Sequence, residues 1–302
     1  MSLILSTAPH IRTPHSTQRL MGNVLISLLP CVAAGIYFFG WAAALVLAVS
    51  TASAVLAEFV WQKLTHKTVR INDLSAAVTG LLIGLVVTPK APWWMVMIAS
   101  FFAIIIVKQL FGGLGDNFLN PALTARAVLL ASWPAIMTTH VTPVDAVTSA
   151  TPLAGYSATT MDLLLGKVPG AIGETCKIAI LIGLAYLLIT RTIRWEIPVF
   201  VVGSAAVMSL LLGMDVLTTV LSGGLLFGAV YMATDYVTSP MKRWSTLVYS
   251  IGVGVMIVLI RKFGAYPEGV TYAIMLMNIC APLFDRMFPD RKLYGHKKEA
   301  KA

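Results

Sequence analysis

The sequence predicts an all-α polytopic membrane protein with about ten transmembrane helices in two inverted five-helix repeats, some of the helices broken. Three observations predict this fold class. Only 12% of the 302 residues are charged, against roughly 25% in soluble domains, so the chain cannot cover a water-facing surface with charge. Apolar stretches long enough to cross a bilayer recur along the chain. Short glycine-rich motifs also recur in its two halves.

The elements follow in order from these patterns. Residues 1–19 are polar and lack the apolar core of a cleaved signal peptide, so we expect a cytoplasmic N-terminal tail. The first five-helix repeat is predicted at 20–134, an external loop at 135–175, the second repeat at 176–288 and a basic cytoplasmic tail at 289–302. Because a bilayer core requires about 20 apolar residues in a helix, the predicted spans are 21–40, 41–62, 74–88, 92–111, 117–134, 176–190, 197–212, 216–234, 245–262 and 268–287.

The net charge of +9 indicates topology. The basic residues punctuate apolar runs instead of gathering on one face, which argues against a nucleic-acid partner. Lys and Arg in short loops stay on the cytoplasmic side, so both termini are expected there and the 135–175 loop outside. The basic residues assigned to the cytoplasm are Lys63, Lys67, Arg70, Lys108, Arg191, Arg194, Lys242, Arg243 and those from Arg286 to Lys301. The exceptions on the outer side are Lys90, Arg261 and Lys262, and the external segment holds only Lys167 and Lys177.

An internal repeat accompanies the ten spans. The run Gly80–Gly84 recurs as Gly224–Gly228, and Lys108–Gly112 is echoed by Arg261–Gly264, at offsets of 144 and 152. Five spans per half is an odd number, so consecutive halves must be inverted, and the functional site of such proteins lies near the midplane between the halves. The alternative is that glycine- and leucine-rich helices resemble one another by chance.

Three stretches are candidates for chemistry. In the first, Gly112–Ala122, the glycines allow close approach to a ligand, and Asn117 and Asn120 offer paired donors and acceptors. The alternative there is that the asparagines only cap backbone groups. The second, Asp145–Leu153, is rich in Thr and Ser, and the third, Met232–Pro240, contains Asp235, which suits either an ion path or a helix cap. On the last span, a solvated helix end explains Glu268 and the Asp285-Arg286 pair but does not readily explain Asn278. The three cysteines form no Cys-x-x-Cys pair, so no metal site is predicted.

Four motifs in order resemble a known family. They are Gly-x-Asn-x-x-Asn-Pro-Ala at 115–122, Asp-x-x-Thr-Ser-Ala-Thr-Pro-Leu at 145–153, Ala-Thr-Asp-x-Val-Thr-Ser-Pro at 233–240, and Glu-Gly-Val-Thr-Tyr-Ala-Ile-x-x-Met-Asn at 268–278. Together they resemble the RnfD subunits of Rnf ion-translocating electron-transport complexes, part of the NqrB/RnfD family, from about Arg19 to Arg286. The related NqrB subunit of the sodium-pumping NADH:quinone reductase is an alternative, although its longer N-terminal region is missing here.

This resemblance implies a flavoprotein. Its members carry an FMN joined through its phosphate to a threonine, which falls on Thr151 here, with Thr148 and Ser149 as competing positions. A separate flavin transferase installs the FMN, and Asp145 is then a recognition residue for that enzyme. A second, non-covalent flavin such as riboflavin is also expected. Asn117, Asn120 and Asn278 are the candidates to line a flavin or ion site.

The same resemblance implies a subunit of a redox-driven ion translocase. Such a subunit lies in the prokaryotic inner membrane and passes electrons between reduced ferredoxin and NAD, coupled to Na⁺ or H⁺ translocation, with the FMN loop on the outer face. The chain has no dinucleotide-binding fingerprint and no ferredoxin-like cysteine run, so other Rnf subunits are required as partners. The rival hypothesis is a stand-alone solute channel or transporter with inverted repeats, which would need no covalent flavin.

Overall fold

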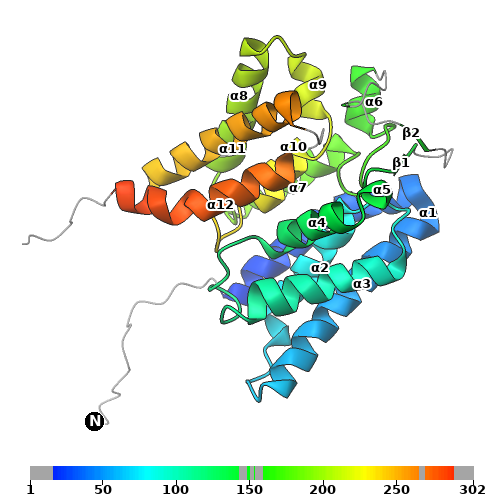
Figure 1. Ribbon diagram of the computed structural model, residues 1–302, viewed down its shortest axis with the longest axis vertical. Coiled ribbons are helices and arrows are strands. Elements are labelled where there is room, and N and C mark those ends of the chain that lie inside the picture. The colour runs from blue at the N-terminus through cyan, green and yellow to red at the C-terminus, as the bar shows by residue number, and fades with distance from the viewer. Residues whose placement is uncertain (1–15, 143–147, 150–152, 154–158, 265–268, 289–302) are drawn as a thin grey trace, which may run out of the picture.

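The computed structural model describes residues 16–142, 148–149, 153, 159–264 and 269–288. Over these residues the chain is helical, and its helices form two neighbouring groups. The first group holds α1 (Thr17–Leu64), α2 (Ser75–Val86), α3 (Trp93–Phe101) and α4 (Pro121–Ser132), in the lower part of Figure 1. The second holds α7 (Lys177–Ile189), α8 (Glu196–Leu211), α11 (Arg243–Phe263) and α12 (Val270–Met287), in the upper part. α1 packs against α7 and α4 against α12, so the groups share an interface.

Short elements complete the chain. They are the 3₁₀ turn η1 (Ile71–Asp73), α5 (Pro134–Met137), α6 (Thr160–Leu165), α9 (Val216–Leu221), α10 (Leu225–Phe227) and two π-helical segments, η2 (Phe102–Gln109) and η4 (Gly228–Met232). Strands β1 (His140–Val141) and β2 (Thr148–Ser149) pair antiparallel, with His140 opposite Ser149. The predicted span 216–234 is therefore divided among α9, α10 and η4.

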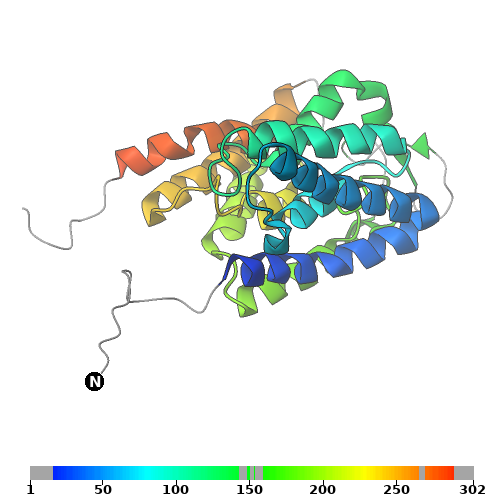
Figure 2. The same ribbon diagram turned by 90° about the horizontal axis from the view of Figure 1, so that it is seen from below.

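α1 covers two predicted spans and breaks between them. Gly40 has φ +64° and ψ −145°, outside the helical region and in a conformation that glycine adopts without a Cβ penalty. The chain doubles back there, so that the two parts of α1 form a helical hairpin (Figures 1 and 2). This break falls at the predicted boundary between spans 21–40 and 41–62.

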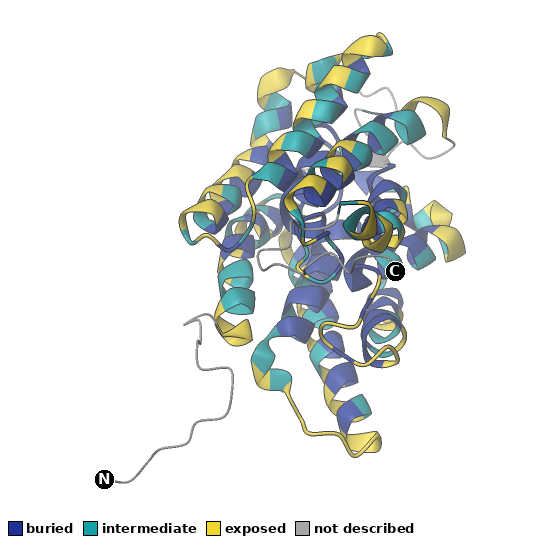
Figure 3. Cartoon of the chain, turned by 90° about the vertical axis from the view of Figure 1, so that its left-hand side faces the viewer, coloured by how far each residue is buried: buried dark blue, intermediate teal, exposed yellow. Residues whose placement is uncertain are grey.

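Apolar side chains cover both the core and the outside of the helices. In Figure 3 the buried positions gather at the centre and the exposed ones at the periphery. Exposed positions include Leu29, Leu56, Ile98 and Ile182, an apolar surface suited to lipid contact rather than to water. Two helices, Thr17–Leu64 and Arg243–Phe263, are long and apolar enough by themselves to span a bilayer, and five shorter apolar helices accompany them in the described part of the chain.

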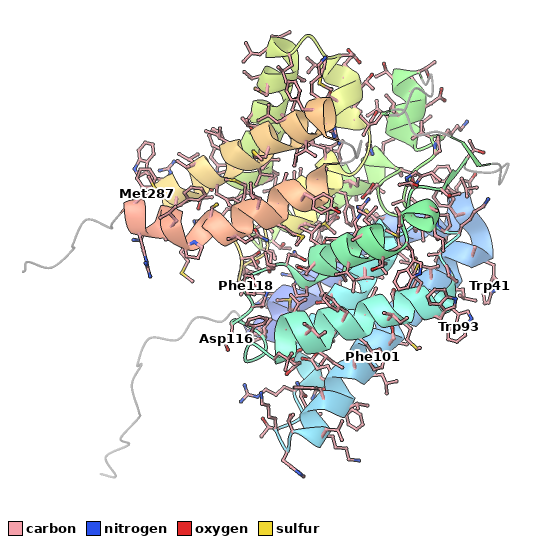
Figure 4. The ribbon with its side chains drawn as sticks, viewed as in Figure 1. Trp41, Trp93, Phe101, Asp116, Phe118 and Met287 are labelled. Atoms are coloured by element: carbon pink, nitrogen blue, oxygen red, sulfur yellow. The ribbon has the colours of Figure 1, made fainter. Side chains whose placement is uncertain are left out.

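Residues that the topology prediction assigns to opposite sides of the membrane lie apart in space. Trp41 and Trp93, beside predicted outer turns, lie at one end of the molecule, and Asp116 and Met287, beside predicted cytoplasmic segments, lie toward the other (Figure 4). Which side of the membrane each end faces, and the inverted repeat, remain predictions. Gly80 packs against α1 near Ser50, whereas Gly224 packs against Glu174, so these repeated motifs do not share a packing partner.

Candidate functional site

The turn before α4 positions the two predicted asparagines. Asn120 is the N-cap of α4, and its Oδ1 accepts hydrogen bonds from the backbone N–H groups of Ala122 (3.0 Å) and Leu123 (3.3 Å). Pro121 follows at the first helical position, where a missing N–H costs nothing. Asn117 Nδ2 donates to the carbonyl of Leu119 at 3.0 Å. The capping role that the sequence left open is therefore present for Asn120.

Both asparagines also line a cavity between the two groups of helices, which we call the inner cavity. Asn120 Nδ2 points across this boundary and donates to the carbonyl of Met232 in η4 at 3.4 Å. The cavity walls include Val78 and Lys108 from the first group and Asp235 from the turn after η4. Its volume is about 70 Å³, which accommodates a few water molecules.

Asp235 contributes a second charged group to the inner cavity. The residue is half-buried, and its carboxylate accepts a hydrogen bond from the Thr238 hydroxyl at 3.1 Å. Burial raises the pKa of Asp235 above its ordinary value, an effect that the hydrogen bonds from Thr238 and from the backbone of Val237 and Tyr236 oppose. The walls of the inner cavity thus combine two amides, an ammonium and a carboxyl group.

A buried ion pair lies beside this cavity. Lys108 Nζ is 2.8 Å from Glu58 Oε1, and both side chains are 2% exposed. Gln109 and Gln62 donate to the same carboxylate oxygen at 2.7 and 3.3 Å, and Lys108 also contacts Ser75 Oγ at 2.6 Å. The π-helical geometry of η2 lets the consecutive residues Lys108 and Gln109 both reach Glu58.

Beyond the ion pair lies a second, larger cavity, which we call the polar vestibule. Its volume is about 860 Å³, and Glu58, Gln62 and Gln109 line it together with charged residues of the 64–74 connection, among them Arg70 and Asp73. The Glu58–Lys108 pair therefore separates two cavities, because Lys108 lines the inner cavity and Glu58 lines the vestibule.

The topology prediction counted Lys108, at the end of the predicted span 92–111, among the cytoplasmic basic residues, and the structure places it inside η2, buried. Sequence reasoning did not identify Glu58 at all. The available signal was a carboxylate within a predicted apolar span, since charged groups at membrane depth are costly and usually functional.

Basic residues gather at the opposite end of the helices, near the predicted flavin-attachment motif. Arg126 from α4 forms a buried ion pair with Glu174, and Lys177 at the start of α7 donates to the carbonyls of Glu174 and Gly223, the latter at 3.1 Å. Arg261 from α11 donates to the carbonyls of Thr219 and Ser222. We call Arg126, Lys177 and Arg261 the basic cluster.

The basic cluster adjoins the attachment motif through Leu153. A Cβ built on Gly223 would lie 3.0 Å from Leu153 Cδ1 and 3.2 Å from Arg261 Nη2, so these groups meet at Gly223. Thr151 and Asp145 lie outside the described residues, and only the backbone of Ser149 and Thr148 is described, in β2.

Asn278 occupies a different place from the other two asparagines. It is buried in α12, where its Oδ1 accepts a hydrogen bond from the Tyr249 hydroxyl of α11 at 2.7 Å. The structure therefore brings Asn117 and Asn120 together at the inner cavity and places Asn278 between α11 and α12.

The chain is similar to known proteins over its full length. The model of the NQR2, RnfD, RnfE family matches residues 4–294. The chain is 47% identical to the D subunit of the Na⁺-translocating ferredoxin:NAD⁺ oxidoreductase complex of Acetobacterium woodii, with 100% of this chain and 99% of the relative covered. It is 39% identical to the D subunit of the proton-translocating ferredoxin:NAD⁺ oxidoreductase complex of Clostridium ljungdahlii, with 93% of each covered. It is 35% identical to the D subunit of an ion-translocating oxidoreductase complex of Shewanella amazonensis, with 98% and 99% covered.

Proposed function

The chain belongs to the NQR2, RnfD, RnfE family, and from this premise we propose that it is the RnfD-type membrane subunit of an ion-translocating ferredoxin:NAD⁺ oxidoreductase complex. The observation that carries the proposal is similarity over the full length to relatives that bear the name of that subunit. The names of two relatives specify different ions, Na⁺ and protons, so the ion is a property to be measured. The protein acts only with the other subunits of the complex, which are its partners.

Within this role we propose that Thr151 carries FMN through a phosphoester, installed by a flavin transferase that recognises Asp145. The basic cluster supports this, because Arg261 and Leu153 both approach Gly223, Leu153 is two residues from Thr151, and guanidinium groups suit phosphate. When bound, the flavin supplies the one-electron and two-electron chemistry. The protein supplies the hydroxyl and cationic surroundings that favour the phosphate.

The covalent attachment is tested by producing the full chain together with the transferase and recording flavin fluorescence of the denatured polypeptide on a gel. We expect fluorescence in the wild type and in the matched controls Thr148→Ala and Ser149→Ala, and none in Thr151→Ala. Undiminished fluorescence of Thr151→Ala would refute the assignment. Absence of covalent flavin from all four proteins would favour the rival function of a stand-alone transporter.

A second flavin, such as riboflavin, is proposed at Asn117 and Asn120. The amides suit the polar edge of a flavin ring, but the described inner cavity of about 70 Å³ has no room for three fused rings. Binding would therefore require α4 and η4 to move apart. Flavin released by denaturing Thr151→Ala is by definition non-covalent, and its loss in Asn117→Ala but not in Asn278→Ala is the expected result.

We further propose ten spans in two inverted repeats, with both termini cytoplasmic and the 135–175 loop outside. The apolar helices and the separation of Trp41 and Trp93 from Asp116 and Met287 support this arrangement. Reporter fusions within the loop and at the C-terminus should report opposite sides of the membrane. Both reporters on one side would refute the topology.

A further inference from the structure

One oxygen of Glu58 has no hydrogen-bond partner within the described part of the chain. Glu58 is only 1% exposed, and its Oε1 accepts three hydrogen bonds. Its Oε2 is also buried but accepts no hydrogen bond from the residues that the structure describes. A buried carboxylate oxygen without a donor is costly. Because Glu58 lines the polar vestibule, a cation arriving from that cavity would meet this residue.

Lys108 already supplies Glu58 with a positive charge, and it lines the same cavity as a second carboxyl group, that of Asp235. Its ammonium contacts Glu58 Oε1 on one side, and the inner cavity that it lines also contains Asp235. Ser75 connects the pair to Asp73, since Ser75 Oγ receives the Lys108 hydrogen bond and contacts Asp73 Oδ1 at 2.8 Å. One ammonium thus pairs with a carboxylate that lines the vestibule, and it also lines the cavity that contains the carboxyl group of Asp235.

We propose that Lys108 is an exchangeable counter-ion: a small monovalent cation from the polar vestibule binds Glu58 and displaces the Lys108 ammonium into the inner cavity, where Asp235 compensates its charge. This inference rests on the proposed ion-translocating function. The entering cation brings one positive charge, and the charge of the site is balanced because Asp235 releases its proton when it receives the Lys108 ammonium. The ammonium occupies the place of the ion, so Glu58 is never left without a cation in the low-dielectric interior.

The arrangement links the two groups of helices. Glu58 and Lys108 belong to the first group, and Asp235 follows η4 of the second. Occupation of Glu58 therefore changes the charge at the interface between the groups, where Asn120 also contacts the carbonyl of Met232. The other charged groups that share the vestibule with Glu58 are Lys67, Arg70 and Asp73, and they remain in place during the exchange.

The test is equilibrium binding of ²²Na⁺ to the full chain in detergent, without electron transfer. In Lys108→Gln, which keeps hydrogen-bond donors but loses the charge, we expect Na⁺ to bind at least tenfold more tightly, because no resident cation competes. Glu58→Gln should lose the binding. Asp235→Asn should weaken it severalfold, because the displaced ammonium has no carboxylate to receive it. Glu196→Gln, which alters the half-exposed pair with Arg243, is the matched control and should bind as the wild type does.

A parallel pH titration of thermal stability separates a proton from Na⁺ as the occupant. If protons occupy Glu58, no variant binds ²²Na⁺. The pH at which thermal stability falls on the acid side should then differ between Lys108→Gln and Glu58→Gln. Unchanged or weakened Na⁺ binding in Lys108→Gln, together with an unshifted transition, would overturn the proposal. If the wild type binds Na⁺, binding of the same affinity in Asp235→Asn would also overturn it. Should Lys108→Gln fail to fold, Na⁺ binding and the acid-side transition of Asp235→Asn decide in its place.

The ion-exchange proposal and the proposed function can fail separately in these measurements. Failure of the exchange leaves flavin attachment and assembly with partner subunits intact. Failure of the proposed function appears as absent flavin and absent partners, whatever Na⁺ does at Glu58.

Discussion

Breaking the Glu58–Lys108 pair should be strongly destabilising. At 2.8 Å and an effective dielectric constant of about 20, the attraction between two unit charges is about 6 kcal/mol, before the cost of removing both from water. Removing one partner of such a buried pair leaves the other uncompensated and typically costs about 3–5 kcal/mol. We expect a loss of this size in Lys108→Met and in Glu58→Gln.

The double variant Glu58→Gln/Lys108→Met should lose much less than the sum of the two single losses, because neither charge is then left alone. The assay is equilibrium unfolding of the purified protein by titration with a denaturing detergent, in choline chloride so that no Na⁺ replaces the lysine. The coupling energy of this double-mutant cycle should exceed about 2 kcal/mol, whereas the more exposed Arg243–Glu196 pair, at 3.8 Å, should give under about 1 kcal/mol. Equal coupling in the two pairs would refute the reasoning.

Three further predictions concern packing, capping and pH. Gly80→Ala places a Cβ 2.7 Å from the carbonyl oxygen of Ser50 and should cost about 1–3 kcal/mol, whereas Gly203→Ala meets no atom within 4 Å and should be tolerated in the same unfolding assay. Asn120→Ala removes the N-cap of α4 and should cost about 1 kcal/mol, with Asn120→Ser retaining most of it. The hydrogen bonds from Thr218 lower the pKa of Asp215, so the stability that Asp215 contributes is present above its unfolded-state pKa and lost as the pH falls through its folded-state pKa. The melting-temperature difference between wild type and Asp215→Ala should therefore shrink on acidification, and a growing difference would contradict the sign.

Hydrophobic patterning predicted the helices well because lipid imposes it on every span. The predicted boundary at residue 40 coincides with the break at Gly40, whereas the span predicted as one segment at 216–234 is divided into α9, α10 and η4. Asn117 and Asn120 were found from their setting among glycines and a proline, which is a local signal. Such signals are contained in a few consecutive residues, and a single sequence displays them directly.

The ion pair could not be found in this way because its partners are 50 residues apart. Hydrophobic patterning does not predict that Glu58 faces Lys108, because their pairing depends on how α1 and η2 pack against each other. The positive-inside rule counts Lys108 as a topology marker and gives no hint of burial. Gly80 and Gly224 illustrate the same limit, because a motif that differs at one position packs against α1 in one place and against Glu174 in the other.

The π-helical segment η2 has a consequence for comparing sequences. Each π turn holds an extra residue relative to an α-helix, in which successive residues are rotated by roughly 100°. Loss of one residue between Phe102 and Val107 would rotate Lys108 and Gln109 by roughly 100° about the helix axis relative to Glu58, without altering a polar side chain. A gap of one position in an alignment of this helix therefore changes the direction of Lys108, even where every charged residue is retained.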